Sequence, residues 1–124
     1  MIKLLVVDDE IEICEFLKSF FEERNYNVVC ANSGEQALEQ VKSEKPNVVL
    51  LDIKMPGIDG VQTLREIKAK YPKTKVIMVT AIETRDKIEE CLRLGADNYI
   101  TKPLSLEYLE NDVKEKIEGT TKVG

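Results

Sequence analysis

Residues 2–10 have the sequence IKLLVVDDE, a nearly unbroken apolar run that leads directly into three acidic residues. Residues 48–52 repeat this arrangement as VVLLD. Runs of Val, Ile and Leu without polar alternation are typical of strands that are buried on both faces of a parallel sheet. The two stretches therefore predict a parallel sheet with carboxylates at the ends of its strands.

Three further apolar runs and five helical patterns complete the expected fold. We expect strands at 2–7, 27–31, 47–51, 75–79 and 98–101. We expect helices at about 10–24, 34–43, 61–69, 88–94 and 106–118, the last capped by Ser105 and stopped by Gly119. This alternation predicts an α/β fold, a doubly wound five-stranded parallel sheet of order 2-1-3-4-5 with helices on both faces, flavodoxin-like (βα)5.

Length and composition limit the function further. The 124 residues are enough for one domain, which we place at residues 1–118 with a flexible tail at 119–124. The chain contains no histidine, which excludes Ser-His, Cys-His and His-metal chemistry. Its net charge of −5 argues against direct nucleic-acid binding. Three widely spaced cysteines and no membrane-spanning run favour a reducing compartment, so we expect a cytoplasmic protein.

The strand ends carry the chemistry. Asp8 and Asp9 follow the first strand, Asp52 follows the third, and Thr80 and Lys102 lie at the ends of the fourth and fifth. These ends meet at one edge of such a sheet, where ligands bind. Three adjacent carboxylates repel one another, and Mg2+ is the hard cation that suits them. Each acidic residue taken alone is explained as well by capping of the next helix.

These side chains are suited to phosphoryl transfer onto a carboxylate. Aspartate can act as a covalent nucleophile toward phosphorus. The metal, Lys102 and the Thr80 hydroxyl could then each hold one of the three equatorial oxygens of the transition state.

Four stretches resemble one family. They are residues 4–10 (LLVVDDE), 48–60 (VVLLDIKMPGIDG), 79–81 (VTA) and 95–104 (GADNYITKPL). In this order and at these spacings, the chain strongly resembles the receiver domain of two-component response regulators over about residues 2–118. Leu104 is a small departure, because the family often has Phe there.

The resemblance implies a specific metal and phosphoryl site. Asp52 would be the phosphoacceptor. Mg2+ would be held by Asp9 and Asp52 directly, by Asp8 through water, and by the main-chain carbonyl of Lys54. Lys102 would bind a phosphoryl oxygen, with the Lys102–Pro103 peptide bond cis.

The resemblance also implies a switch and a partner. Thr80 would hydrogen-bond the phosphoryl group and Tyr99 would move inward with it, changing the face made by the fourth helix, fifth strand and fifth helix to control an output partner or domain. The donor would be a phosphohistidine of a sensor histidine kinase or phosphotransfer protein. Phosphorylation and slow autodephosphorylation would be self-catalysed, without turnover of a separate substrate. Whether the receiver acts alone or begins a longer regulator stays open.

Ile13 lies at the edge of the apolar stripe of the first helix, and we expect it to be partly exposed and to contact the donor protein.

A flavodoxin-like electron carrier would need a hydroxyl- and glycine-rich phosphate loop where this chain has Asp8 and Asp9. An aspartyl phosphatase would need Asp-x-Asp, whereas Asp52 is followed by Lys54. A degenerate receiver that acts only as a protein-interaction module is the main alternative.

Overall fold

The structure is a computed structural model that describes residues 1–122. Five strands form one parallel sheet in the order β2-β1-β3-β4-β5, which confirms the predicted order. The strands are β1 (Lys3–Val7), β2 (Asn27–Ala31), β3 (Val48–Asp52), β4 (Lys75–Thr80) and β5 (Asn98–Thr101). β3 and β4 each run one residue further than expected, so Asp52 and Thr80 belong to the ladder itself.

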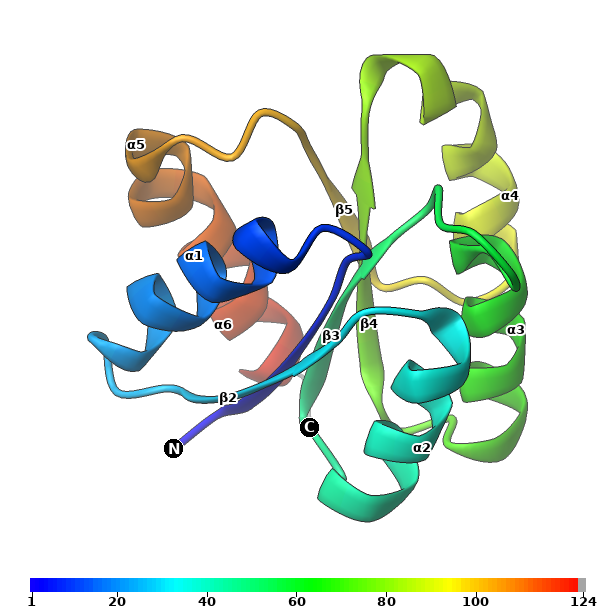
Figure 1. Cartoon of the computed structure of the whole chain (residues 1–124), viewed down its shortest axis with the longest axis horizontal. Helices are drawn as coiled ribbons and strands as arrows, with labels where there is room; N and C mark the ends of the chain where they lie inside the picture. The colour runs from blue at the N-terminus through cyan, green and yellow to red at the C-terminus, as the bar shows by residue number, and fades with distance from the viewer. Residues whose placement is uncertain (123–124) are drawn as a thin grey trace.

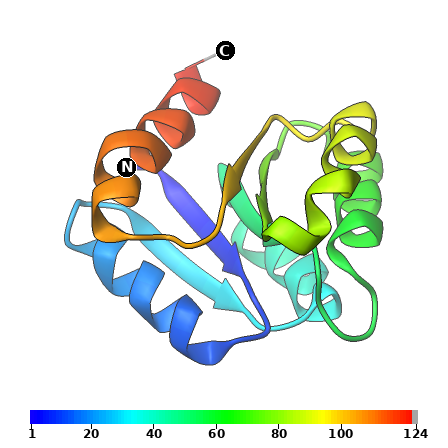
Figure 2. The same ribbon diagram turned by 90° about the horizontal axis from the view of Figure 1, so that it is seen from above.

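Helices cover both faces of this sheet, as predicted (Figure 1). The elements are α1 (Ile11–Glu22), α2 (Gly34–Glu44), α3 (Gly60–Lys70), the 3-10 helix η1 (Ile82–Lys87), α4 (Ile88–Arg93), α5 (Leu106–Tyr108), the π-helical turn η2 (Leu109–Val113) and α6 (Lys114–Lys122). We call the continuous segment of α5, η2 and α6 the C-terminal helix. Figure 2 shows α1 and the C-terminal helix on one side of the sheet and α2, α3 and α4 on the other. Among residues 1–122, no helix is both long and apolar enough to cross a membrane.

The core has two layers because successive strand side chains point to opposite faces. Leu4 and Val6 of β1 pack in the layer beneath α1 and the C-terminal helix. Leu5 and Val7 of the same strand pack in the layer beneath α2, α3 and α4. Burial on both faces accounts for the unbroken apolar runs in the sequence.

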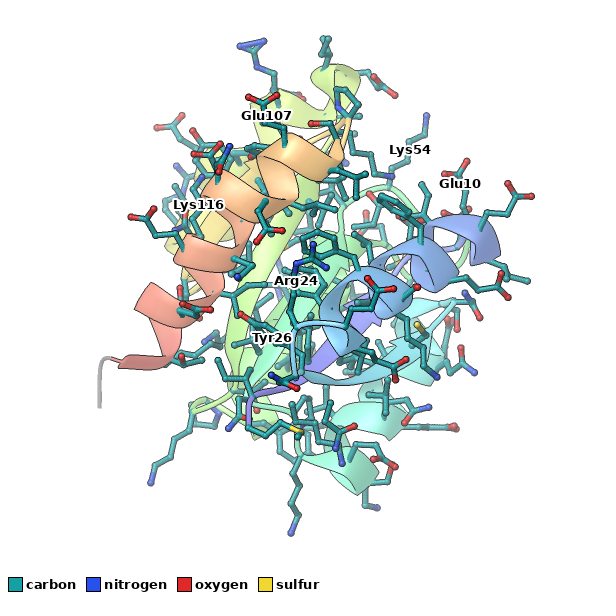
Figure 3. All side chains as sticks on the ribbon, turned by 90° about the vertical axis from the view of Figure 1, so that its left-hand side faces the viewer. Glu10, Arg24, Tyr26, Lys54, Glu107 and Lys116 are labelled. Carbon is teal, nitrogen blue, oxygen red and sulfur yellow. The ribbon has the colours of Figure 1, made fainter. Side chains whose placement is uncertain are left out.

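Polar contacts hold the turn between α1 and β2 against the C-terminal helix. The hydroxyl of Tyr26 donates to Glu118 at 2.9 Å, and Arg24 Nε donates to Glu110 at 2.8 Å. Figure 3 shows Arg24 and Tyr26 in the space between α1 and the C-terminal helix. The two contacts attach the C-terminal helix at Glu110 and at Glu118.

The predicted helix stop at Gly119 is wrong, because α6 continues to Lys122. Gly in a helix costs only about 1 kcal/mol relative to Ala. The buried Ile117 and the Glu118–Tyr26 hydrogen bond stabilise the turn that precedes Gly119. Residues 119–122 are therefore helical, and the flexible tail remains a prediction for residues 123–124, which lie outside the described residues.

The connection from β3 to α3 starts at Asp52, the last residue of the central strand. Gly57 has a φ of 78°, a left-handed conformation that glycine adopts without strain. Gly60 lies directly against the carbonyl of Asp52, where a β-carbon would clash. Its N–H donates to the carbonyl of Ile53 at 2.8 Å. The loop therefore turns back closely enough to bring the start of α3 against the end of β3.

Candidate functional site

Three carboxylates meet at the carboxyl ends of β1 and β3. These strands are adjacent in the sheet, and their register pairs Val7 with Leu51. Asp8 is 3% exposed and Asp52 is 7% exposed, whereas Asp9 is open to solvent. One carboxylate oxygen from each of the three lies within 4.8 Å of the others. The structure thus brings together the acidic residues that the strand-end argument placed at one edge.

Backbone contacts fix the position of Asp8. Its N–H continues the sheet ladder by donating to the carbonyl of Ala31 at 3.1 Å. Its carbonyl accepts from the side-chain amide of Asn32 at 3.0 Å. Its Oδ1 accepts from the backbone N–H of Glu10 at 2.9 Å, just before α1 begins. One carboxylate oxygen is therefore held locally, and the other faces the cluster.

Lys102 lies between the two buried carboxylates. Its Nζ is 3.2 Å from Asp8 Oδ2 and 3.3 Å from Asp52 Oδ2. Its backbone N–H donates to the carbonyl of Thr80 at 2.9 Å, and the Lys102–Pro103 peptide bond is cis. Burial lowers the pKa of Lys102, but the attraction of Asp52 and Asp8 outweighs it and raises that pKa overall. The lysine therefore stays charged at neutral pH.

Asp52 is held in an unfavourable environment for a carboxylate. Burial and repulsion by Asp8 raise its pKa to about 6, although Lys102 and the backbone N–H of Lys54 act in the opposite direction. One ammonium does not fully compensate two buried carboxylates and the neighbouring Asp9. The donors are all carboxylate oxygens, the ligands that Mg2+ prefers. The residues present therefore fit Mg2+, and the role of the Lys54 carbonyl stays a prediction.

Thr80 is buried at the end of β4 with its hydroxyl engaged locally. Thr80 Oγ1 donates to the carbonyl of Ala81 at 3.0 Å and lies 2.9 Å from Thr84 Oγ1. Thr84 Oγ1 also accepts from the N–H of Ala81 at 3.1 Å. Thr84 was not recognised from the sequence. The sequence pattern does not pair it with Thr80. The two hydroxyls meet because η1 begins at Ile82 and turns Thr84 back toward the end of β4.

Tyr99 lies on β5 at the edge of the sheet and is 39% exposed. A hollow of about 430 Å3 lies beside it, lined by residues that include Ala81, Ile82 and Arg85. On the C-terminal helix, Lys116 Nζ donates to the carbonyl of Tyr99 at 2.9 Å. Lys116 is a second contact that the sequence did not reveal, since nothing in the pattern links positions 17 residues apart.

Ile13 is half-buried at the start of α1, and Phe16 on the same side is 42% exposed. Together with Pro103 and Leu104 they line an apolar hollow of about 460 Å3 that also reaches Lys102. The structure therefore places an apolar surface directly beside the acidic cluster.

Comparison with known proteins identifies the family. Residues 4–114 match the family described as the response regulator receiver domain, and the chain belongs to it. The transcriptional regulatory protein ZraR of Escherichia coli (strain K12) is 40% identical over 119 residues, which is 96% of this chain and 27% of that protein. The chain thus spans about a quarter of the length of this curated relative.

Solved structures agree with this assignment. A CheY-like response regulator receiver domain protein from Methanospirillum hungatei has a TM-score of 0.89 and 32% identity, covering 100% of this chain and 99% of that one. The response regulator domain of CheB from Thermotoga maritima has a TM-score of 0.88 and 35% identity, covering 100% and 98%. The molecule is therefore a receiver domain of two-component systems.

Proposed function

We propose that this receiver accepts a phosphoryl group on Asp52 from a phosphohistidine that lies outside these 124 residues. The observation that carries the proposal is the buried Asp52 carboxylate at the end of β3, which lies beside Asp8 and shares the Lys102 ammonium with it. A sensor histidine kinase or a phosphotransfer protein would supply the donor, because the chain contains no histidine.

The transfer needs few groups besides Asp52. An oxygen of its carboxylate forms a bond to phosphorus while the phosphorus–nitrogen bond of the phosphohistidine breaks, and the imidazole leaves with the electron pair. Lys102 stays charged and neutralises a phosphoryl oxygen. Magnesium held by Asp8, Asp9 and Asp52 would supply further positive charge to the phosphoryl oxygens.

Labelling by a small phosphodonor tests this function. The wild-type chain incubated with acetyl phosphate and Mg2+ should gain the mass of one phosphoryl group. The same reaction in excess EDTA should give only background labelling, because the clustered carboxylates lack their counter-charge. Labelling at the full rate in EDTA would contradict the metal requirement. A chain that took up no phosphoryl group with Mg2+ would instead be a degenerate receiver.

Docking of the donor is expected on the apolar hollow beside the site. Ile13→Ala removes an apolar contact there without touching Asp52. Transfer from the cognate kinase should slow by about five-fold or more, the effect of losing about 1 kcal/mol at an interface. Acetyl phosphate should label the variant at the wild-type rate. Equal slowing with both donors would indicate a folding defect rather than lost docking.

The phosphoryl group would act on Thr80 and Tyr99. Its oxygens are strong acceptors, and Thr80 Oγ1 is bound only to neighbours in its own loop, Ala81 and Thr84. Movement of Thr80 would pull this loop and let Tyr99 enter the hollow beside η1. The face made by α4, β5 and the C-terminal helix would change with it and control an output partner or domain.

Thr80→Ala separates phosphorylation from this switch. The variant should still be phosphorylated on Asp52. It should fail to change the amide chemical shifts of residues 85–108 when beryllofluoride, a phosphoryl mimic, is added. Loss of one charge-assisted hydrogen bond, about 1.5–3 kcal/mol, lowers the switching equilibrium by about ten- to a hundred-fold. A full wild-type response in Thr80→Ala would show that the coupling runs through other groups.

A further inference from the structure

Side chains occupy the backbone groups on the open edge of β5. The N–H of Tyr99 donates to Asn98 Oδ1 at 2.8 Å, and its carbonyl accepts from Lys116 Nζ at 2.9 Å. The N–H of Thr101 donates to the hydroxyl of Tyr108 at 3.1 Å. An edge strand usually leaves such groups open to solvent. Here two of these three contacts come from the C-terminal helix. They link that helix directly to β5.

Lys116 contacts Tyr99 twice. Besides the bond to the carbonyl, its ammonium lies 5.3 Å from the centre of the Tyr99 ring, within cation–π range. Figure 3 shows Lys116 projecting from the C-terminal helix. That helix is anchored by the buried Ile117 and by the bond from Tyr26 to Glu118. Lys116 therefore extends from a fixed backbone to one orientation of the tyrosine.

The two contacts depend differently on the position of the ring. The carbonyl of Tyr99 belongs to the strand, so its bond to Lys116 is available wherever the ring lies. The ring contact exists only while the ring points outward. A contact that is made in one state and lost in the other shifts the equilibrium between them. Lys116 thus stabilises the outward state selectively.

We propose that Lys116 is a positioning residue that holds Tyr99 outward and opposes the phosphorylation switch. This inference rests on the proposed role of Tyr99. Lys116 would then help to set the fraction of receiver molecules that have Tyr99 inward when a given fraction of Asp52 is phosphorylated. Removing the ammonium should favour the inward state about two- to five-fold, which corresponds to one exposed cation–π contact.

A titration with beryllofluoride at constant Mg2+ tests the proposal, followed through the NMR signals of the Tyr99 ring. Lys116→Met should lower the midpoint concentration by about two- to five-fold. Lys116→Gln, which keeps a donor for the carbonyl, should do the same. Lys116→Arg should keep the wild-type midpoint. Lys114→Met is the matched control, because Lys114 lies on the same helix and bonds Glu110 at 3.3 Å.

Two comparisons distinguish this role from a purely structural one. In a Tyr99→Leu background the same titration is followed through the amide chemical shifts of residues 85–108. There Lys116→Met should leave the midpoint unchanged, since the ring through which it acts is gone. Thermal unfolding reports stability separately from the midpoint. A wild-type midpoint in Lys116→Met and Lys116→Gln would overturn the inference, as would an equal shift in Lys114→Met or a shift that persists with Tyr99→Leu. If wild-type Tyr99 did not respond to beryllofluoride, the proposed switch itself would fail, and this inference with it.

Discussion

Asp52→Asn is expected to take up no phosphoryl group from acetyl phosphate or from a histidine kinase. The amide cannot act as the nucleophile toward phosphorus, and no other carboxylate among residues 1–122 has the same surroundings. Asp8 is equally buried, but its Oδ1 accepts from the N–H of Glu10. Asp9 is exposed to solvent. Intact-mass measurement after incubation with Mg2+ should show one added phosphoryl group in the wild type and none in the variant.

The controls for this experiment are chosen from the same part of the molecule. Asp59→Asn replaces the N-cap residue of α3 and leaves Asp52 in place. The Oδ1 of Asp59 accepts from the backbone N–H of Gln62 at 2.9 Å. Labelling of this variant should match the wild type. Labelling of Asp52→Asn at a comparable level would show that another residue is the phosphoacceptor. It would remove the main support for the proposed function.

The same substitution is expected to stabilise the protein at neutral pH without metal. Folding raises the pKa of Asp52 from 3.8 to about 6, chiefly through burial and then through repulsion by Asp8. A carboxyl with a raised pKa contributes stability below its unfolded pKa and loses it as the pH rises through the folded value. The charged form therefore costs the folded protein about 3 kcal/mol above pH 7.

Asparagine cannot ionise and avoids this cost. At pH 7.5 in EDTA, Asp52→Asn should raise the free energy of unfolding by about 2–3 kcal/mol, as measured by urea denaturation. The difference should fall steadily between pH 6 and pH 4 and disappear below that. Asp112→Asn, an exposed position, should change stability by less than about 0.5 kcal/mol. An Asp52→Asn variant less stable than the wild type at pH 7.5 would mean that Lys102 outweighs the burial of the carboxylate.

Magnesium provides a second check on the same energetics. An ion that binds the folded wild type adds stability by mass action. Adding Mg2+ should therefore narrow the gap between the wild type and Asp52→Asn, because the variant has lost one of its three clustered carboxylates. An identical gain in both proteins would place the ion elsewhere.

The sequence alone determined the fold and the acidic cluster. Unbroken apolar runs indicated strands covered on both faces, and the alternating helices required parallel connections. In such a sheet all strands end at one edge, so residues far apart in the chain had to meet there. That reasoning placed Asp8, Asp52 and Lys102 together. In the structure, Lys102 Nζ lies within 3.3 Å of a carboxylate oxygen of each aspartate.

Only the tertiary structure decided the contacts around Thr80 and Tyr99. Periodicity tells which face of an element is buried, but not which side chain reaches across to another element. The pairing of Thr80 with Thr84 depended on where η1 begins, and the contact of Lys116 with Tyr99 on how the C-terminal helix lies along β5. The helix also passes Gly119, which local propensity predicted as its end. Packing of Ile117 and the Tyr26–Glu118 bond outweighed that weak preference, because tertiary contacts stabilise more than one residue's propensity costs.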